Sequence, residues 1–338
     1  MPYGGSMKQK MLFFTIITML FACGGPQSDE KSHNFIIATA TTGGTYYPVG
    51  VALGTIITQK QAPALTASAI NSAGSGENIQ MLVNKEAQLA ILQGLYGAMA
   101  YKGKGTYAGQ PIQNIRSITM LWENVEHFLL QSEYAKTGNI QDLQNLKQKY
   151  SIGKRGSGTE GSTLTILQAL GIEPDTDFIP EYLGYSPSIQ AMIDGRIAGA
   201  STPAGPPVAA VTQALAQLGQ DVTLLSFTET QLEKIRAEFP VWTAHTLPIN
   251  TYPGQTKTIQ TIAQPNFLAC HADLPEDVIY TLTKTIYDHL PEIQNIHKAT
   301  LAMKLEKAIA GLAVPLHPGA AKFYREKGLT IPADLIVP

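Results

Sequence analysis

Three stretches rich in glycine, serine and threonine occur where an apolar run gives way to a predicted helix. They are TTGGTYYP at 41–48, NSAGSGEN at 71–78 and GKRGSGTEGS at 153–162. Glycine lets the backbone turn tightly and approach a ligand closely. Free N–H groups and the dipole at the start of the following helix favour negative charge, and the hydroxyls add hydrogen bonds. These residues therefore suit the noncovalent binding of an anion.

The third loop also has the spacing of a dinucleotide-binding fingerprint. Gly156, Gly158 and Gly161 spell G-x-G-x-x-G between a predicted strand and a predicted helix. Asp175 and Asp177 follow near the distance at which a ribose-binding acid is expected. A nucleotide-binding enzyme that uses this loop is therefore one alternative. Two observations weaken this alternative. The loop is one of three similar loops, and the start of the chain indicates export to a compartment where nicotinamide cofactors are scarce.

A single loop of this kind is most simply a turn with a helix N-cap, since Gly, Ser and Thr are favoured there. Three such loops on successive strand–helix units favour a shared ligand site. In open α/β sheets these loops gather at the carboxyl edge of the strands, where ligands bind.

Motifs for catalysis or metal binding are missing from the sequence. It has no H-E-x-x-H, CxxC or G-x-S-x-G, and its seven histidines are scattered. Cys270, His271 and Asp273 are too close along the chain to face one point. Cys270 lies in the apolar run PNFLACHA, which is typical of a buried core thiol. We therefore expect a binding protein rather than an enzyme, with no metal and no cofactor.

Composition limits the other classes of function. The chain has 338 residues, of which 44% are hydrophobic and 15% charged, with a net charge of −2. A chain of this length is expected to form two domains with well-buried cores. No run of Lys and Arg is present, so we expect no nucleic-acid partner, whose phosphates such a run would neutralise.

The first residues indicate export. Lys8 and Lys10 precede an apolar run at 11–22 that is typical of a secretory signal and too short to span a bilayer. The run ends in LFAC, which resembles the lipobox of bacterial lipoproteins. We expect a signal peptide at 1–22, lipidation of Cys23 and a linker at 23–33. The mature protein would then be periplasmic and attached to a membrane by its lipid.

The remaining sequence alternates short apolar runs with helical patterns, which predicts an α/β fold with mostly parallel sheets covered by helices on both faces. Strands are expected at 34–40, 64–70, 88–93, 115–122, 127–131, 150–153, 178–183, 197–201 and 222–227. Helices are expected at 48–58, 77–84, 94–101, 140–146, 161–170, 188–194 and 207–218, and further helices follow residue 275.

The chain resembles the TAXI branch of the periplasmic solute receptors that serve TRAP transporters. The resemblance covers about nine-tenths of the mature chain, in the order of the family's motifs. It rests on TGGTYYPVG at 42–50, GSGENIQML at 74–82, AQLAILQ at 87–93, GSGTEGS at 156–162, AMIDGRIAGA at 191–200, ADLPEDVIY at 272–280 and VPLHPGAAKFY at 314–324.

The resemblance implies a two-lobed, type II Venus-flytrap fold that closes on a small organic anion and delivers it to a permease driven by an ion gradient. Glutamate-like amino acids, 2-oxo acids and dicarboxylates are the ligands that it implies. We assign 34–124 and 248–338 to the first lobe and 125–247 to the second, in a monomer. Gly94 and Ala198 depart from the family pattern, so the ligand stays open. A sensor that contacts a signalling partner is a further alternative.

The loops and the strand ends give the expected ligand contacts. The 156–159 loop would hold a carboxylate with its N–H groups. Tyr46 would pack on the ligand or donate its hydroxyl, although it also suits a core position, and Gln93 ends a strand whose side chains face the cleft. The full set is Thr41, Gly44, Thr45, Tyr46, Ser75, Asn78 and Gln93 in the first lobe, and Ser157, Gly158, Thr159, Ser186 and Thr202 in the second.

Overall fold

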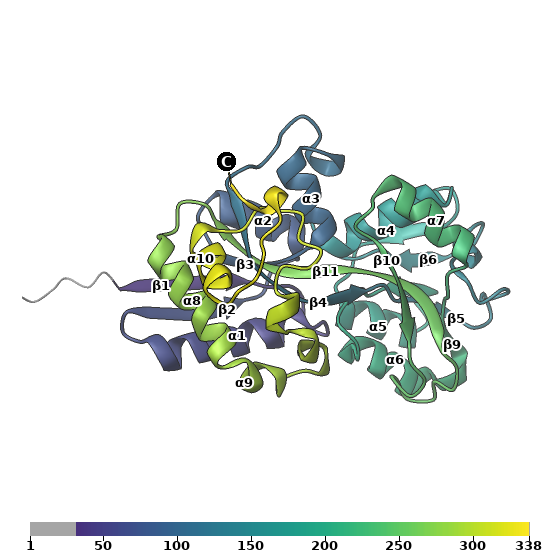
Figure 1. Ribbon diagram of the computed structural model, residues 1–338. Helices are drawn as coiled ribbons and strands as arrows, with labels where there is room; N and C mark the ends of the chain where they lie inside the picture. The colour runs from purple at the N-terminus through teal and green to yellow at the C-terminus, as the bar shows by residue number, and fades with distance from the viewer. Residues whose placement is uncertain (1–31, 338) are drawn as a thin grey trace, which may run out of the picture. The chain divides into compact units, whose positions relative to one another are not determined.

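Two mixed β-sheets, each with helices around it, organise the part of the chain that this computed structural model describes, residues 32–337 (Figure 1). The predicted signal peptide, Cys23 and most of the predicted linker lie outside the described residues. Among residues 32–337, no helix is long and apolar enough to cross a lipid bilayer. We call the half built on the six-stranded sheet the first lobe and the half built on the five-stranded sheet the second lobe.

The sheet of the first lobe has strand order β10-β11-β3-β1-β2, with β4 paired to β11. Its strands are β1 (His33–Ala38), β2 (Leu65–Ile70), β3 (Leu89–Gln93), β4 (Ile115–Val125), β10 (Thr243–Leu247) and β11 (Ile259–His271). β1 is parallel to β2 and β3, whereas β11 is antiparallel to β3, β4 and β10. The helices of this lobe are α1 (Tyr46–Gln61), α2 (Ser75–Val83), α3 (Gly94–Lys102), α8 (Glu276–Asp288), α9 (Leu290–Gln294) and α10 (Pro318–Glu326).

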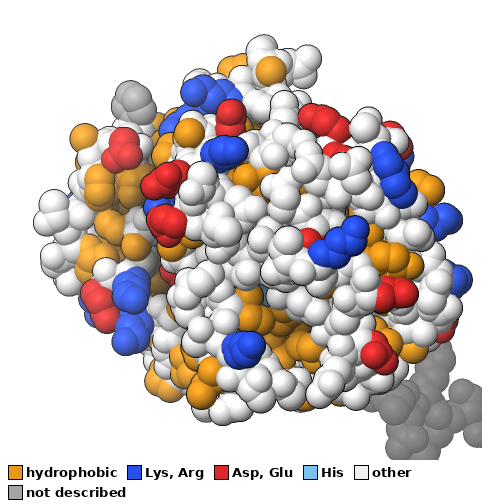
Figure 2. All heavy atoms as spheres, turned by 90° about the vertical axis from the view of Figure 1, so that its right-hand side faces the viewer, with side chains coloured by type: hydrophobic (Ala, Val, Ile, Leu, Met, Phe, Trp, Pro, Cys, Tyr) orange, Lys and Arg blue, Asp and Glu red, His pale blue; other side chains and the backbone are white. Residues whose placement is uncertain are grey.

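The sheet of the second lobe has strand order β7-β6-β8-β5-β9. Its strands are β5 (Phe128–Gln131), β6 (Lys149–Ser151), β7 (Ile179–Glu181), β8 (Gly199–Ser201) and β9 (Val222–Leu224), and its helices are α4 (Gly158–Ala169), α5 (Tyr185–Ile193), α6 (Ala209–Leu218) and α7 (Glu229–Glu238). β6 is parallel to β7 and β8, and β5 is antiparallel to β8 and β9. Figure 2 shows one face of this lobe, on which acidic and basic side chains are interspersed.

Apolar spacing explains why these elements form. Helix α1 buries Val49, Leu53, Ile56 and Ile57, whose spacing of three to four residues places them on one face. Strand β3 is buried along its whole length, as expected for a strand covered on both faces. The predicted helix at 140–146 is instead a 3₁₀ turn, Ile140–Leu143. Cys270 is fully buried in the core, as predicted.

Strands β4 and β11 run from one lobe to the other (Figure 1). Leu121 of β4 and Phe267 of β11 belong to the apolar core of the first lobe. Ile262 and Val125 pack instead with apolar residues of the second lobe. The proposed lobe boundaries themselves stay a prediction.

Polar side chains occupy the crossing of these two strands. Asn124 pairs in register with Gln264, and Asn266 with Trp122. The side chains of Asn124, Gln264 and Asn266 are buried, with 0–1% of their surface exposed. Buried amides need hydrogen-bond partners, so this crossing is a place where the fold supports a polar arrangement.

Candidate ligand-binding site

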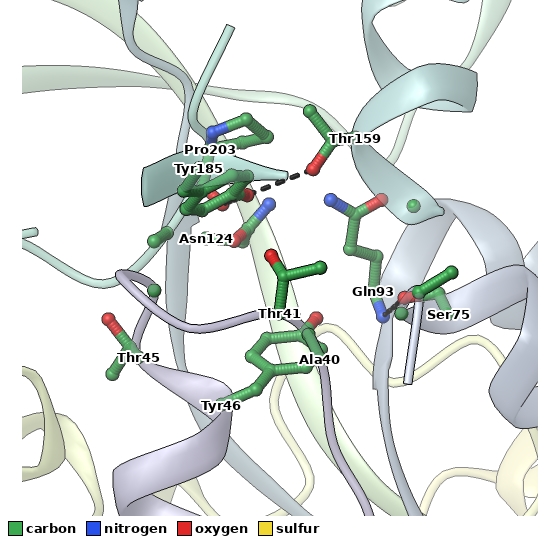
Figure 3. A pocket seen from close by; sticks show the side chains of 15 residues that line it. Ala40, Thr41, Thr45, Tyr46, Ser75, Gln93, Asn124, Thr159, Tyr185 and Pro203 are labelled. Carbon is green, nitrogen blue, oxygen red and sulfur yellow. Dashed lines mark hydrogen bonds between the residues drawn. The ribbon is translucent and has the colours of Figure 1, made fainter. Parts of the chain in front are cut away.

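A pocket lies between the lobes, beside the crossing of β4 and β11 (Figure 3). Its cavity volume is about 30 Å³, room for only one or two water molecules. Its lining comes from the loops after β1, β2 and β3, from β4, and from the loops before α4, α5 and α6. The lining residues are Ala40, Thr41, Gly44, Thr45, Tyr46, Ala73, Gly74, Ser75, Gln93, Asn124, Gly158, Thr159, Tyr185, Pro203 and Ala204.

Helix N-termini converge on this pocket. Helices α1, α2, α4 and α5 begin at Tyr46, Ser75, Gly158 and Tyr185, and each of these residues lines it. Among the described residues of the lining, none is Lys, Arg, His, Asp or Glu. The lining itself therefore contributes helix dipoles and N–H groups, which favour an anion.

The loop before α4 prepares two of these N–H groups. The Ser157 hydroxyl accepts a hydrogen bond from the Glu160 N–H at 3.0 Å, and the Glu160 carboxylate accepts one from the Gly156 N–H at 2.7 Å. Ser157 is thus the N-cap of α4 and not part of the lining. Within the described part of the chain, the N–H groups of Gly158 and Thr159 have no acceptor and remain available to a ligand.

Asn124 presents a donor whose orientation is set by a relay. The Tyr46 hydroxyl donates to Oδ1 of Asn266, and Nδ2 of Asn266 donates to Oδ1 of Asn124 at 3.3 Å. Burial raises the pKa of Tyr46, so its hydroxyl keeps its proton. Nδ2 of Asn124 is then left facing the pocket, buried and without a partner among the described residues. A buried donor without a partner is costly, and a ligand oxygen would satisfy it.

Gln93 places a second amide opposite Asn124. The Gln93 N–H donates to the Ser75 hydroxyl at 3.0 Å, which holds the end of β3 against the start of α2. Its side chain is 3% exposed. In Figure 3 its amide nitrogen points into the pocket toward Asn124, and its oxygen turns toward α4. That oxygen has no partner within the described structure.

Thr159 and Tyr185 form the wall from the second lobe. The Tyr185 hydroxyl donates its proton to the Pro203 carbonyl, so the 2.9 Å contact with Thr159 uses the proton of Thr159 (Figure 3). Burial raises the pKa of Tyr185, which keeps it protonated. The Thr159 oxygen therefore faces a ligand as an acceptor, and the Thr159 N–H faces it as a donor.

The lobes touch directly around the pocket. The Glu77 N–H donates to the Gly156 carbonyl at 3.0 Å, and the Thr45 hydroxyl donates to the Gly205 carbonyl at 2.8 Å. Gly158 abuts Gln93 so closely that an added Cβ would lie 2.6 Å from Oε1 of Gln93. The lobes are therefore in contact across the pocket in this structure.

Most of the contact residues expected from the sequence line this pocket: Thr41, Gly44, Thr45, Tyr46, Ser75, Gln93, Gly158 and Thr159. Their role as ligand contacts stays a prediction. Asn124, Tyr185 and the Pro203–Ala204 segment also line the pocket but were not expected from the sequence. Asn124 is a polar residue near the end of a long apolar strand, and that was its one signal.

Four expected residues do not line the pocket. The Asn78 amide donates to the carbonyl groups of Thr39 and Ile91 at 2.7 and 2.9 Å, so it ties β1 to β3. Ser157 caps α4, and Ser186 lies on α5 against Gly43. Thr202 is fully buried behind the pocket wall. Arg155, which flanks the 156–159 loop, stacks on the Tyr182 ring at 3.5 Å instead of entering the pocket.

Comparisons with known proteins agree on the fold. A model of the NMT1-like family matches residues 37–328. MatC from Rhodopseudomonas palustris with bound malate is 13% identical, with a TM-score of 0.55 over 87% of this chain and 97% of MatC. A protein from Bordetella bronchiseptica is 15% identical, with a TM-score of 0.51 over 91% of this chain and 86% of that one. A structure described as a periplasmic transporter is 13% identical, with a TM-score of 0.50 over 88% and 93%.

These structures confirm the expected two-lobed α/β fold of periplasmic solute-binding proteins.

Proposed function

This chain belongs to the NMT1-like family, and we propose that it is an exported solute-binding receptor, and not an enzyme, that captures a small carboxylate. It delivers this ligand to a TRAP permease driven by an ion gradient. The motifs at 42–50 and 314–324, which resemble the TAXI branch, support the TRAP assignment.

The observation that carries the proposal is the convergence of helix N-termini and amide donors on a pocket without a charged side chain. A carboxylate has two oxygens that only accept hydrogen bonds. The N–H groups of Gly158 and Thr159 would bind one end of the ligand, and Nδ2 of Asn124 and the Gln93 amide nitrogen would bind another. A cationic ligand would face the positive ends of these helices and is disfavoured.

The size of the pocket supports a small ligand. The cavity volume is about 30 Å³ in this arrangement, so a four- or five-carbon dicarboxylate needs the lobes to part slightly, and a nucleotide or oligosaccharide would need a much wider opening. The bound malate of MatC belongs to a protein of the same fold and is a reasonable first compound to test here. The Thr159 oxygen is an acceptor, so it would suit a hydroxyl or amino group on the carbon chain of the ligand.

Ligand capture would act through the contact between the lobes. Gly158 and Thr159 belong to the second lobe, and Gln93 belongs to the first. A ligand that bonds to both favours the closed arrangement by its differential affinity for that state. The surface formed on closure is what the permease would recognise.

The test is a screen by thermal unfolding of the purified protein against malate, 2-oxoglutarate, glutamate, sugars, nucleotides and sulfonates. We expect a dicarboxylate or an acidic amino acid to raise the unfolding temperature. Isothermal calorimetry then gives the stoichiometry and Kd. A screen in which only sugars or nucleotides stabilise the protein contradicts the proposal.

A further inference from the structure

Glu126 is a buried carboxyl group at the crossing between the lobes, two residues beyond Asn124. It is 1% exposed, and neither of its carboxyl oxygens has a hydrogen-bond partner among the described residues. Its backbone is held in place, because its N–H donates to the Ile262 carbonyl at 2.9 Å and its carbonyl accepts from the Thr261 hydroxyl at 2.8 Å. The side chain therefore cannot reach solvent without breaking strand contacts.

The groups that face this carboxyl are neutral. Ser162 of α4 and Gln264 of β11 lie close to it without making a hydrogen bond of normal geometry. Oε1 of Gln264 is already used by the Leu95 N–H at 2.7 Å, so its amide nitrogen is the end left for Glu126. The ring of the neighbouring His127 bonds to the Val125 carbonyl and to the Tyr252 hydroxyl instead.

Three tyrosines complete these surroundings. Burial raises the pKa of Tyr46, Tyr150 and Tyr185, and the nearby carboxyl of Glu126 raises each of them further. Burial also lowers the pKa of His127 to about 3, so that ring is neutral. No Lys, Arg or protonated His within the described chain pairs with Glu126. Burial without a cation raises the pKa of Glu126 to about 8.

Glu126 also lies near the pocket, since it follows the lining residue Asn124 by two positions. Tyr46 and Tyr185 line the pocket, and both respond to the charge of Glu126. The lining has no cation that would separate a bound anion from this carboxyl. In a low-dielectric site two neighbouring like charges disfavour each other. An anionic ligand and an ionised Glu126 are therefore alternatives.

We propose that capture of an anionic ligand is coupled to proton binding by Glu126, so that the receptor holds its ligand with this carboxyl neutral and releases it more readily when the carboxyl ionises. This inference rests on the proposed function. The coupling is reciprocal: the anion favours the proton, and the proton favours the anion.

The direction of the effect follows from the carboxyl group. At a pH where Glu126 is protonated the affinity is at its maximum. As the pH rises and the group ionises, the affinity falls. Malate and 2-oxoglutarate have no group that titrates between pH 7 and 9, so with these probes the change belongs to the protein.

The experiment is calorimetry of malate and 2-oxoglutarate binding at pH 7, 8 and 9, in buffers with different enthalpies of ionisation. For the wild type we expect Kd to rise about 5- to 10-fold over this range, because one proton that titrates near pH 8 cannot change it more, with proton uptake of about half an equivalent near pH 8. Glu126→Gln keeps the shape of a neutral acid. It should bind about as tightly as the wild type at pH 7, with no proton uptake and no change in Kd up to pH 9.

Glu123→Gln is the matched control, because Glu123 lies on β4 three residues before Glu126, is half exposed and pairs with His245 at 3.0 Å. It should keep the wild-type pH dependence. Binding of either probe without proton uptake, or an unchanged pH dependence in Glu126→Gln, overturns the inference.

If neither probe binds at any pH, this inference fails for them, and the thermal-unfolding screen with glutamate decides whether the proposed function fails too. Urea unfolding without ligand tests Glu126 separately, since the stability of Glu126→Gln should differ from that of the wild type between pH 5 and 8 if Glu126 titrates in this range.

Discussion

Replacing Gly158 with alanine separates closure of the lobes from folding. Gly158 is the first residue of α4, where alanine suits the backbone. The added Cβ would lie 2.6 Å from Oε1 and 2.7 Å from Cδ of Gln93, and 2.8 Å from the Ser75 hydroxyl. All of these atoms belong to the first lobe, and both side chains are buried. The clash therefore falls on the contact between the lobes.

The size of the effect follows from packing. Forcing an extra carbon into a well-packed contact costs about 1–3 kcal/mol. This cost applies to the closed arrangement alone, because the clash disappears when the lobes separate. Since every 1.4 kcal/mol is tenfold in an equilibrium constant, Kd for the ligand should rise by roughly 5- to 150-fold.

Calorimetry measures the affinity, and small-angle X-ray scattering measures the mean separation of the lobes. We expect Gly158→Ala to bind more weakly and to have a larger radius of gyration, with little loss of unfolding temperature. Gly54→Ala is the control: its Cβ would lie 3.0 Å from the Ala67 carbonyl, inside the first lobe. It should leave Kd unchanged whatever its effect on stability, because this contact lies within one lobe. If Gly158→Ala binds with wild-type affinity and an unchanged radius, the lobes do not close on the ligand through this contact.

Three further predictions concern charge and anchoring. Asn124→Asp replaces the pocket donor by a carboxylate of the same shape, so malate affinity measured by calorimetry should fall at least tenfold, about 1.4 kcal/mol. Asn124→Ser has a hydroxyl donor and no charge, so it should bind malate more tightly than Asn124→Asp and more weakly than the wild type. The pKa of Glu126 is about 8 in the folded protein and 4.5 when unperturbed, so its neutral form favours the folded state. That contribution is fully present below pH 4.5 and is lost as the pH rises through about 8, a change of about 5 kcal/mol. Between pH 5 and 8, the free energy of unfolding of Glu126→Gln, measured with urea, should rise relative to that of the wild type by about 1.4 kcal/mol per pH unit. If the two proteins show the same dependence of this free energy on pH, the raised pKa of Glu126 is refuted. Cys23→Ser should abolish labelling with a radioactive fatty acid, and continued labelling would show that the lipid is attached elsewhere.

Local sequence patterns were enough to find the loops, because glycine, serine and threonine at a strand–helix junction have a local physical meaning. The start of α4 shows the limit of prediction from local sequence patterns. The helix was predicted from residue 161 but begins at Gly158, because Ser157 caps it there and the Glu160 carboxylate closes the turn. A hydroxyl expected to bind the ligand therefore stabilises the helix.

The long strand β11 was not predicted because Pro265 interrupts its apolar pattern, and proline argues against a strand interior. The structure resolves this conflict. β10 pairs with β11 as far as Ala263, and β3 begins to pair at Asn266. Pro265 thus lies between the segments of β11 that pair with β10 and with β3. On that edge of β11, residue 265 has no partner strand, so its missing N–H breaks no hydrogen bond there. This arrangement depends on strands far apart in the sequence.

Asn124 and Tyr185 were missed for the same reason. Each lies in the pocket only because the two lobes meet, and each is oriented by distant groups: Asn124 through Asn266 and Tyr46, and Tyr185 through the Pro203 carbonyl. Nothing near them in the sequence indicates these partners. Sequence patterns therefore identified the backbone donors of the site better than its side-chain donors.

The absence of a charged side chain from the described lining has a physical advantage for a receptor that must release its ligand. A buried Arg or Lys would be costly in the empty pocket and would hold any small anion strongly. Helix N-termini and the amides of Asn124 and Gln93 carry no net charge, so selectivity depends on the position of the ligand oxygens. In such a neutral pocket the ionisation state of Glu126 is the largest electrostatic variable nearby, and a change of one proton there shifts the balance between capture and release.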